Sequence, residues 1–178
     1  MDFRSAMTKN PLHTFIFFIG WLLYATQALA FNDVELSIWS NEVIVSAYTL
    51  SADTLLASQK SLARYFTNTA WVDYTKALQT SKLNDAIQKN NYTVSAVALL
   101  PPTVKTLREG IEWQATMPLL VLYKNNDYQQ KQTLEVVITF VKAKANEGVR
   151  GLAITSFNTT ISTAPCRCAQ WSKTKTFV

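Results

Sequence analysis

The sequence predicts an α+β domain in which N-terminal helices pack on an antiparallel sheet of about four strands. The first observation is that residues 31–90 contain neither glycine nor proline and carry apolar residues at helical spacing. The second is that, from Tyr92 onward, apolar residues recur at every second position, as in strands. The third is the order. Helices come first and are followed by consecutive strands with short loops, which favours an antiparallel sheet with its helices on one face.

The first two helices are expected before residue 67. One runs from Asp33 to about Tyr48, and Trp39 adds to its apolar surface of Val34, Ile38, Ile44 and Ala47. After a polar break, a second helix begins near Asp53 or Thr54. Its buried stripe is expected to comprise Leu55, Leu56, Leu62, Ala63 and Phe66.

A third helix is expected after the polar segment Thr67 to Thr69, which supplies a capping residue. Residues at three- and four-residue steps place one apolar face on Trp71, Tyr74, Ala77 and Leu78. A further short helix or turn covers Leu83 to Ile87.

Four strands are expected in the second half of the domain. They cover Val94 to Leu100, the alternating segments around Trp113–Tyr123 and Leu134–Phe140, and residues 149–161. One face of the second strand is expected to be apolar along its whole length. The opposite face begins with polar residues and is apolar only at Leu120 and Leu122. The core is expected to combine helix residues with sheet residues: Trp39, Phe66, Trp71 and Leu78 with Trp113, Leu119, Ile138 and Phe140.

Three prolines limit how these strands can pair. Pro101 and Pro102 cannot donate ladder hydrogen bonds, so they belong at an edge, a bend or a loop. Pro118 lies inside an otherwise regular strand pattern, and it needs an edge or a bulge, with a bend expected there.

The N-terminus has the layout of a secretory signal peptide. Arg4 and Lys9 precede an apolar run from Phe15 to Ala25, and small residues end at Ala30. Cleavage is expected between Ala30 and Phe31, and a retained membrane anchor is the alternative. The expected organisation is a signal segment over 1–30, one exported domain over 31–163 and a C-terminal tail over 164–178.

Composition excludes several classes of function. The net charge is +5, but the basic residues are scattered, so they indicate solvated faces and no nucleic-acid partner. The only histidine, His13, lies in the expected signal segment, which excludes a Ser-His-Asp triad and a histidine metal site in the exported chain. Nucleotide and calcium motifs are absent, so no cofactor is expected. Asp73, Glu112 and Tyr123 could serve an enzyme, but ordinary surface and core roles explain them better.

The only two cysteines, Cys166 and Cys168, lie in the stretch "STAPCRCAQW". Behind a signal peptide they would enter an oxidising compartment. A disulfide between the two is the first interpretation, because a bent backbone over three residues allows the Cα atoms to approach within about 7 Å. A crosslink to another chain comes second, and a metal site shared between two chains comes third. Trp171, in the polar tail, would either dock on the domain or wait for a partner.

Helices lying across a curved sheet resemble the nuclear-transport-factor-2-like cone fold, and the chain resembles one family more specifically. The ordered motif residues are Trp39 with Ala47 and Tyr48; Phe66, Thr67, Trp71, Tyr74, Ala77, Leu78 and Ser81; Pro102, Gly110, Trp113, Pro118, Leu119 and Tyr123; and the strands at 134–141 and 151–154. This order is similar to that of the DotI/IcmL family, inner-membrane-complex components of type IVB secretion systems. Trp39, Phe66, Trp71, Trp113 and Pro118 are the motif residues expected to specify the fold.

The resemblance implies a non-enzymatic assembly protein that contacts other envelope proteins of a secretion apparatus, as a homo- or hetero-oligomer. Three features depart from the family pattern: Ala70 in place of a glycine, a segment that looks cleavable in place of an anchor, and the Cys-x-Cys tail. The alternative is a soluble periplasmic module that binds a small apolar ligand in the cone. Assembly predicts a filled cone and an exposed apolar patch, whereas ligand binding predicts a cavity with convergent polar groups.

Overall fold

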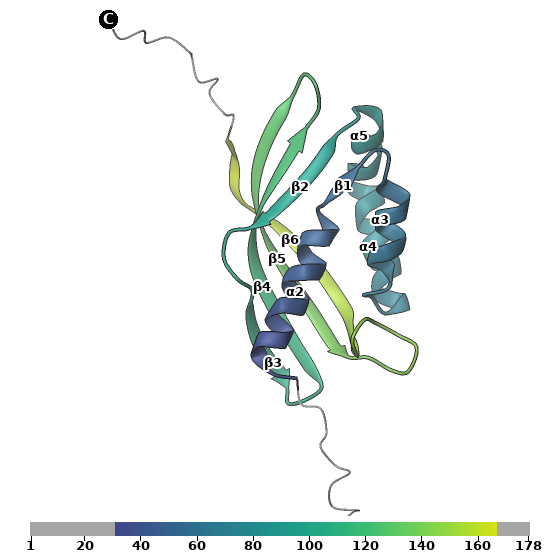
Figure 1. Ribbon diagram of the computed structural model, residues 1–178, viewed down its shortest axis with the longest axis vertical. Coiled ribbons are helices and arrows are strands. Elements are labelled where there is room, and N and C mark those ends of the chain that lie inside the picture. The colour runs from purple at the N-terminus through teal and green to yellow at the C-terminus, as the bar shows by residue number, and fades with distance from the viewer. Residues whose placement is uncertain (1–30, 167–178) are drawn as a thin grey trace, which may run out of the picture. The chain divides into compact units, whose positions relative to one another are not determined.

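The computed structural model describes residues 31–166 of the 178-residue chain (Figure 1). Its helices come first: α2 (Asp33–Ala47), α3 (Leu55–Ala63), α4 (Asn68–Ser81) and α5 (Leu83–Lys89). Its strands are β1 (Leu50–Ser51), β2 (Thr93–Ala98), β3 (Thr103–Arg108), β4 (Glu112–Lys124), β5 (Gln129–Lys142) and β6 (Leu152–Cys166). The predicted α+β class and the order of helices before strands are confirmed.

All strand pairs in the sheet are antiparallel, in the order β1-β2-β4-β5-β6, and β3 also pairs with β4. The four predicted strands correspond to β2, β4, β5 and β6, and the sheet has two more. Strand β1 could not be predicted, because two residues show no periodicity. Strand β3 could not be predicted either, because nearly all of its residues are exposed, so the strand lacks an apolar face.

On one side of β4, the neighbouring strand changes at Pro118 from β3 to β2. Ala98 of β2 pairs with Leu119, and Thr103 of β3 pairs with Thr116. Leu99 N–H donates to the Pro118 carbonyl at 2.9 Å, so the side of Pro118 that lacks an N–H faces this gap. The register of β4 with β5 continues without a shift through Pro118. The expected edge-like position is therefore found, without a bulge in β4.

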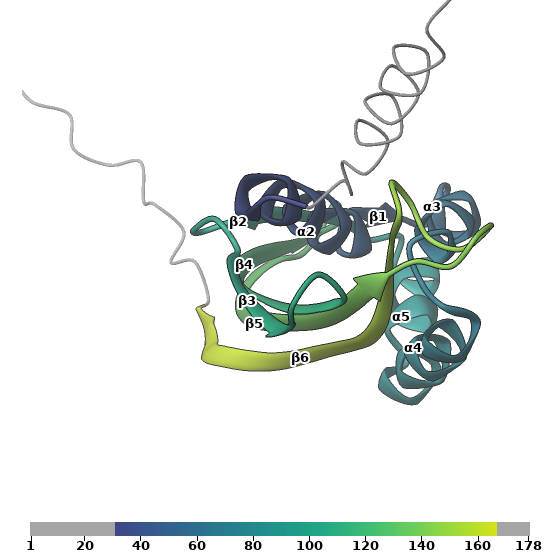
Figure 2. The ribbon, with the colours of Figure 1, turned by 90° about the horizontal axis from the view of Figure 1, so that it is seen from below.

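Helix α2 lies on the concave side of the sheet, which curves around it (Figure 2). Asn32 caps its first turn, where the Asn32 side chain accepts from Glu35 N–H and the Glu35 side chain accepts from Asn32 N–H. The face of α2 that contacts the sheet is buried and comprises Leu36, Trp39, Ser40, Val43, Ile44 and Ala47.

Two parts of the predicted helical stripes are wrong. Val34 and Ile38 of α2 are exposed, because they lie on nearly the opposite side of the helix from the buried face, which is centred on Leu36, Trp39 and Val43. Leu56 of α3 is exposed as well, because only Leu55 and Leu62 of that helix reach the core.

Helix α4 is less buried than its sequence suggested. Ala70 is its only buried residue, whereas Trp71, Tyr74 and Leu78 are half-buried and Ala77 is exposed. The reason is position, because α4 packs beside β6 at the edge of the sheet and not over its middle. The prediction that Leu78 belongs to the core is therefore wrong.

Candidate protein-binding surface

The concave face of the sheet is filled by side chains from the helices and the strands. The inward-facing residues of β4 and β5 are almost fully buried: Trp113, Ala115, Met117, Leu119, Val121, Leu134, Val136, Ile138 and Phe140. Trp39 of α2 packs on Phe140 with ring centroids 5.0 Å apart, and Trp113 stacks on Phe140 at 5.8 Å. Phe31, the first described residue, meets Trp113 edge-on at 5.7 Å.

The opposite, convex face carries apolar side chains over β2 and β4, which are exposed on β2 and half-buried on β4. Val97 pairs directly with Leu120, so both side chains leave the sheet on the side opposite the buried Leu119 and Val121. Leu122 lies on the same side, and Leu99 and Leu100 are exposed where β2 ends. We call this set, Val97, Leu99, Leu100, Leu120 and Leu122, the convex patch.

The charges beside the convex patch are mainly basic. Lys131 pairs with Leu122 and therefore faces the same side of the sheet, as does Lys124 two residues further along β4. Lys105 pairs with Gln114 on the same face, but it lies six residues along β4 from Leu120 and so outside the patch. Glu135, opposite Pro118, is the acid closest to the patch in register. A partner for this surface would match it best with apolar residues and a surrounding acidic rim.

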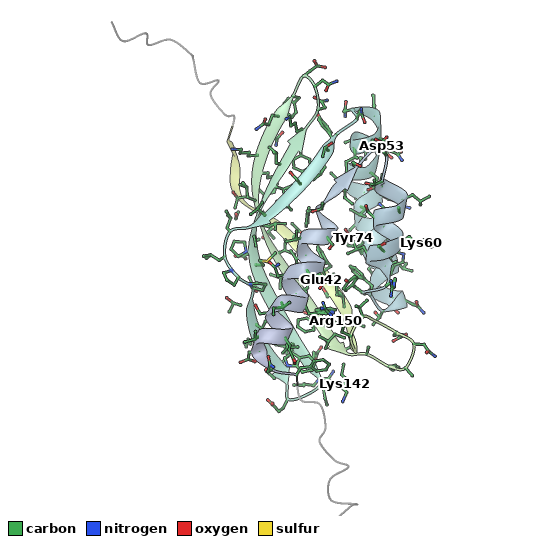
Figure 3. All side chains as sticks on the ribbon, in the orientation of Figure 1. Glu42, Asp53, Lys60, Tyr74, Lys142 and Arg150 are labelled. Carbon is green, nitrogen blue, oxygen red and sulfur yellow. The ribbon has the colours of Figure 1, made fainter. Side chains whose placement is uncertain are left out.

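A polar network ties α2 to the loop between β5 and β6. Tyr65 O–H and Arg150 Nη2 both donate to the Glu42 carboxylate, and Arg150 and Glu42 form an ion pair (Figure 3). The indole N–H of Trp39 donates to the Val149 carbonyl at 3.1 Å. The Tyr65 hydroxyl is the main cause that lowers the pKa of Glu42, Arg150 adds to it, and partial burial opposes both. The Glu42 carboxylate is therefore a weaker base than usual, and its hydrogen bond from Arg150 holds the loop between β5 and β6 against α2.

The three residues considered for catalysis are not brought together. Glu112 lies at the start of β4 and Tyr123 near its end, eleven residues away, or roughly 36 Å along the strand. Glu112 accepts from Arg108 at 2.7 Å, and Asp73 is exposed on α4. Burial raises the pKa of Tyr123, which makes its phenolate harder to form.

An aromatic cluster joins α4 to β6. Next to it, Tyr48 makes a hydrogen bond to β6 that the sequence pattern did not predict. Phe66 packs against Trp71 at 5.4 Å, Tyr74 at 5.0 Å and Phe157 of β6 at 6.0 Å. At the end of α2, Tyr48 shares a 2.6 Å hydrogen bond with the Thr159 hydroxyl. Residues 111 positions apart meet here, so no local pattern predicts the pair.

Tyr48 is expected to make the domain less stable in alkali. Burial raises its pKa to about 12 from the ordinary 10, although the hydrogen bond with Thr159 opposes that rise. Between pH 10 and 12 the unfolded chain therefore loses the Tyr48 proton more readily than the folded chain, and stability falls as pH rises. Denaturant unfolding at several alkaline pH values should show that Tyr48→Phe removes part of this decline. An unchanged slope in the variant would contradict the assignment.

The structure places the motif residues as follows. Trp39, Phe66 and Trp113 are buried, Trp71 is half-buried against Phe66, and Pro118 is partly exposed on the convex face. Cys166 ends β6 opposite Lys131, and only its backbone is described. The predicted disulfide partner Cys168 and the predicted cleavage residue Ala30 lie outside the described residues.

Within residues 31–166, no three side chains of the histidine, cysteine, aspartate or glutamate type gather in a way that could hold a metal ion. None of the helices described there has the length and apolarity needed to cross a membrane.

Comparisons with known proteins identify the family. The family model described as "Type-IV b secretion system, inner-membrane complex component" matches residues 21–161. An IcmL-like type IV secretion system protein from Legionella pneumophila is similar in structure, with 44% identity, a TM-score of 0.73, and coverage of 78% of this chain and 99% of that one. No match is found among curated protein sequences.

Two more distant structures share the fold. The periplasmic domain of DotI has 23% identity and a TM-score of 0.71, covering 76% of this chain and 99% of that one. The soluble domain of TrwG from Bartonella grahamii has 16% identity and a TM-score of 0.59, covering 75% of this chain and 98% of that one. The family match spans most of the chain, and the relative with 44% identity spans more than two thirds of it. The chain therefore belongs to the DotI/IcmL family of type IVB secretion-system components.

Proposed function

We propose that this protein is a non-enzymatic assembly component of a type IVB secretion apparatus, acting in the bacterial periplasm through protein–protein contacts. Membership of a secretion-system family supports the setting. The related DotI structure is that of a periplasmic domain, which supports the compartment.

The observation that carries the assembly role is the convex patch. Exposed Val97, Leu99 and Leu100 stand beside outward-facing Leu120 and Leu122, whereas the concave face is filled by the domain's own side chains. Contiguous apolar patches on soluble proteins commonly mark interaction sites. Assembly needs such an outer surface, whereas ligand binding in the cone needs room among the residues that are packed together here.

The test is a crosslinked pull-down of the tagged protein from native envelopes, with two matched variants. Val97→Glu places a charge in the convex patch, and Val34→Glu places the same charge on α2 at a similar exposure, 67% against 63% for Val97. We expect Val97→Glu to reduce recovery of other secretion-apparatus proteins at least tenfold, which is about 1.4 kcal/mol of lost contact. Val34→Glu should recover them as the wild type does.

Melting temperatures of both variants must match the wild type, so that lost recovery reports contact and not unfolding. Equal recovery with Val97→Glu would remove the convex patch from the proposal. A wild-type protein that recovers no apparatus protein from envelopes in which the apparatus is assembled would overturn the assembly role and favour the ligand-binding module.

We also propose that the chain is exported and cleaved between Ala30 and Phe31, and that Cys166 and Cys168 are oxidised to each other. The small residues before Phe31 and the oxidising compartment support this. Intact mass of protein taken directly from the envelope, alkylated with and without prior reduction, should give a chain that starts at Phe31 and gains two alkyl groups only after reduction. A mass that includes residues 1–30 would show a retained segment, and alkylation without reductant would show free thiols.

A further inference from the structure

Two exposed lysines lie next to the convex patch on the same face of the sheet. Lys131 of β5 pairs directly with Leu122, and Lys124 follows Leu122 two residues along β4, about 7 Å away. Glu135, the acid closest to the patch in register, lies four residues from Lys131 along β5, or roughly 13 Å. Positive charge is therefore concentrated at the Leu122 end of the convex patch, and the one negative charge lies at the opposite end.

The chain does not neutralise these two lysines. Within residues 31–166, neither Lys124 nor Lys131 belongs to an ion pair, with Asp127 of the nearby turn or with any other acid. Cys166 of β6 lies opposite Lys131 in register, so the segment after it begins beside this lysine. Residues 167–178 contain three basic side chains and no acidic one. The sequence that follows β6 therefore supplies no carboxylate side chain to either lysine.

The described helices leave this face uncovered, because they lie on the concave side of the sheet or beside β6 (Figure 2). We propose that the convex patch binds a segment of another apparatus protein in which apolar side chains are followed, at one end, by aspartate or glutamate. The apolar side chains would cover the patch, and the carboxylates would pair with Lys124 and Lys131. Glu135 sets the direction, because carboxylates at its end of the patch would meet a like charge.

Charge disfavours two other occupants of the convex patch. A second copy laid face to face brings two lysines and one glutamate from each chain, so four lysines would meet two glutamates and leave an excess of positive charge. The chain's own residues 167–178 are basic, so they would be repelled as well. A partner that carries carboxylates leaves no such excess, and charge pairs at the rim of an interface select a partner more than they add affinity.

This inference rests on the assembly role proposed above and names the chemistry of the partner. Lys124→Glu combined with Lys131→Glu reverses the local charge. Lys60→Glu combined with Lys89→Glu is the control, because it changes the net charge equally at exposed sites on α3 and α5. In the crosslinked pull-down from native envelopes, we expect the first pair to reduce recovery of apparatus proteins at least tenfold and the control to recover them as the wild type does.

A neutral variant separates lost attraction from added repulsion. Lys124→Gln combined with Lys131→Gln should reduce recovery by only about two- to fivefold, because exposed ion pairs contribute little individually. All variants must melt at the temperature of the wild type, so that lost recovery reports contact and not unfolding.

A zero-length carbodiimide crosslink tests the contact directly, because it joins an amine only to a carboxylate that it touches. In wild-type envelopes, mass spectrometry should identify peptides in which Lys124 or Lys131 is joined to an aspartate or glutamate of an apparatus protein. Lys60 and Lys89, which are also exposed, should not be joined to that protein.

Three results would overturn the inference. The first is equal recovery of apparatus proteins by the charge-reversed variant and its control. The second is a carbodiimide link from Lys131 to Glu135, which are too far apart within one chain and would therefore come from a second copy. The third is purified protein that floats with vesicles containing phosphatidylglycerol and loses this binding on charge reversal, because the lysines would then serve a lipid surface.

The acidic partner and the assembly role can fail separately. If Val97→Glu loses the apparatus proteins and the charge-reversed variant keeps them, the acidic partner is refuted and the assembly role stands. If the wild type recovers no apparatus protein, the assembly role itself is refuted, whatever the lysine variants do.

Discussion

Replacing Trp39 with alanine is expected to lower the free energy of unfolding by about 3–5 kcal/mol, the usual cost of removing a buried tryptophan. The side chain is 2% exposed, and its ring lies 5.0 Å from Phe140 and 5.9 Å from Tyr65. Its removal leaves a cavity between α2 and the sheet and frees the Val149 carbonyl. Urea denaturation followed by far-ultraviolet circular dichroism would measure the loss, and a value below about 1.5 kcal/mol would contradict the role assigned to Trp39.

Trp39→Phe separates packing from hydrogen bonding. The smaller ring keeps much of the contact with Phe140 but loses the indole N–H that bonds the Val149 carbonyl at 3.1 Å. We expect a smaller loss of stability and faster hydrogen exchange in the loop between β5 and β6. Unchanged exchange in that loop would show that the Glu42–Arg150 ion pair holds it without Trp39.

Phe66→Ala is expected to cost about 3–5 kcal/mol as well, for a different reason. Phe66 is buried, forms the bridge to Ile154 and holds Trp71, Tyr74 and Phe157 around it. Its loss would detach α4 from β6, so exchange of amide hydrogens near Ile154 should accelerate more than exchange in β4. Thermal and urea unfolding would give the size of the effect.

Trp71→Ala is the comparison for Phe66→Ala. Trp71 belongs to the same cluster but is only half-buried on the surface of α4, so we expect a loss of at most about 2 kcal/mol. Equal losses in the two variants would mean that the cluster acts as a surface contact and that Phe66 does not anchor β6.

The long strands were readable from the sequence because burial on one face imposes a period of two over many residues. In β4 the buried side chains from Trp113 to Val121 alternate with partly exposed ones, as predicted. Helix α2 was placed well, but its buried face was not. Valines and isoleucines occur on both sides of the helix, so apolar composition alone could not show that Val34 and Ile38 lie on the exposed side.

The sequence indicated only part of the convex patch. Leu120 and Leu122 stand out because they break the polar face of β4. Their combination with Val97 depends on the register of β2 against β4, which is a long-range property. The same holds for the position of β6, because its own residues do not show whether it lies inside the sheet or at its edge.

By itself, the sequence determined the fold class, four of the six strands, the helices before them and a family resemblance that the comparisons confirm. These follow from local physics, because side-chain periodicity and proline chemistry act over neighbouring residues. Only the tertiary structure decided that α4 packs at an edge, that Pro118 faces a gap between β2 and β3, and which apolar residues stay outside. Those outcomes depend on which distant segments pack on each face of the sheet. The hydrophobic effect is not directional, so it does not determine which side chain is buried against which until the strands have paired.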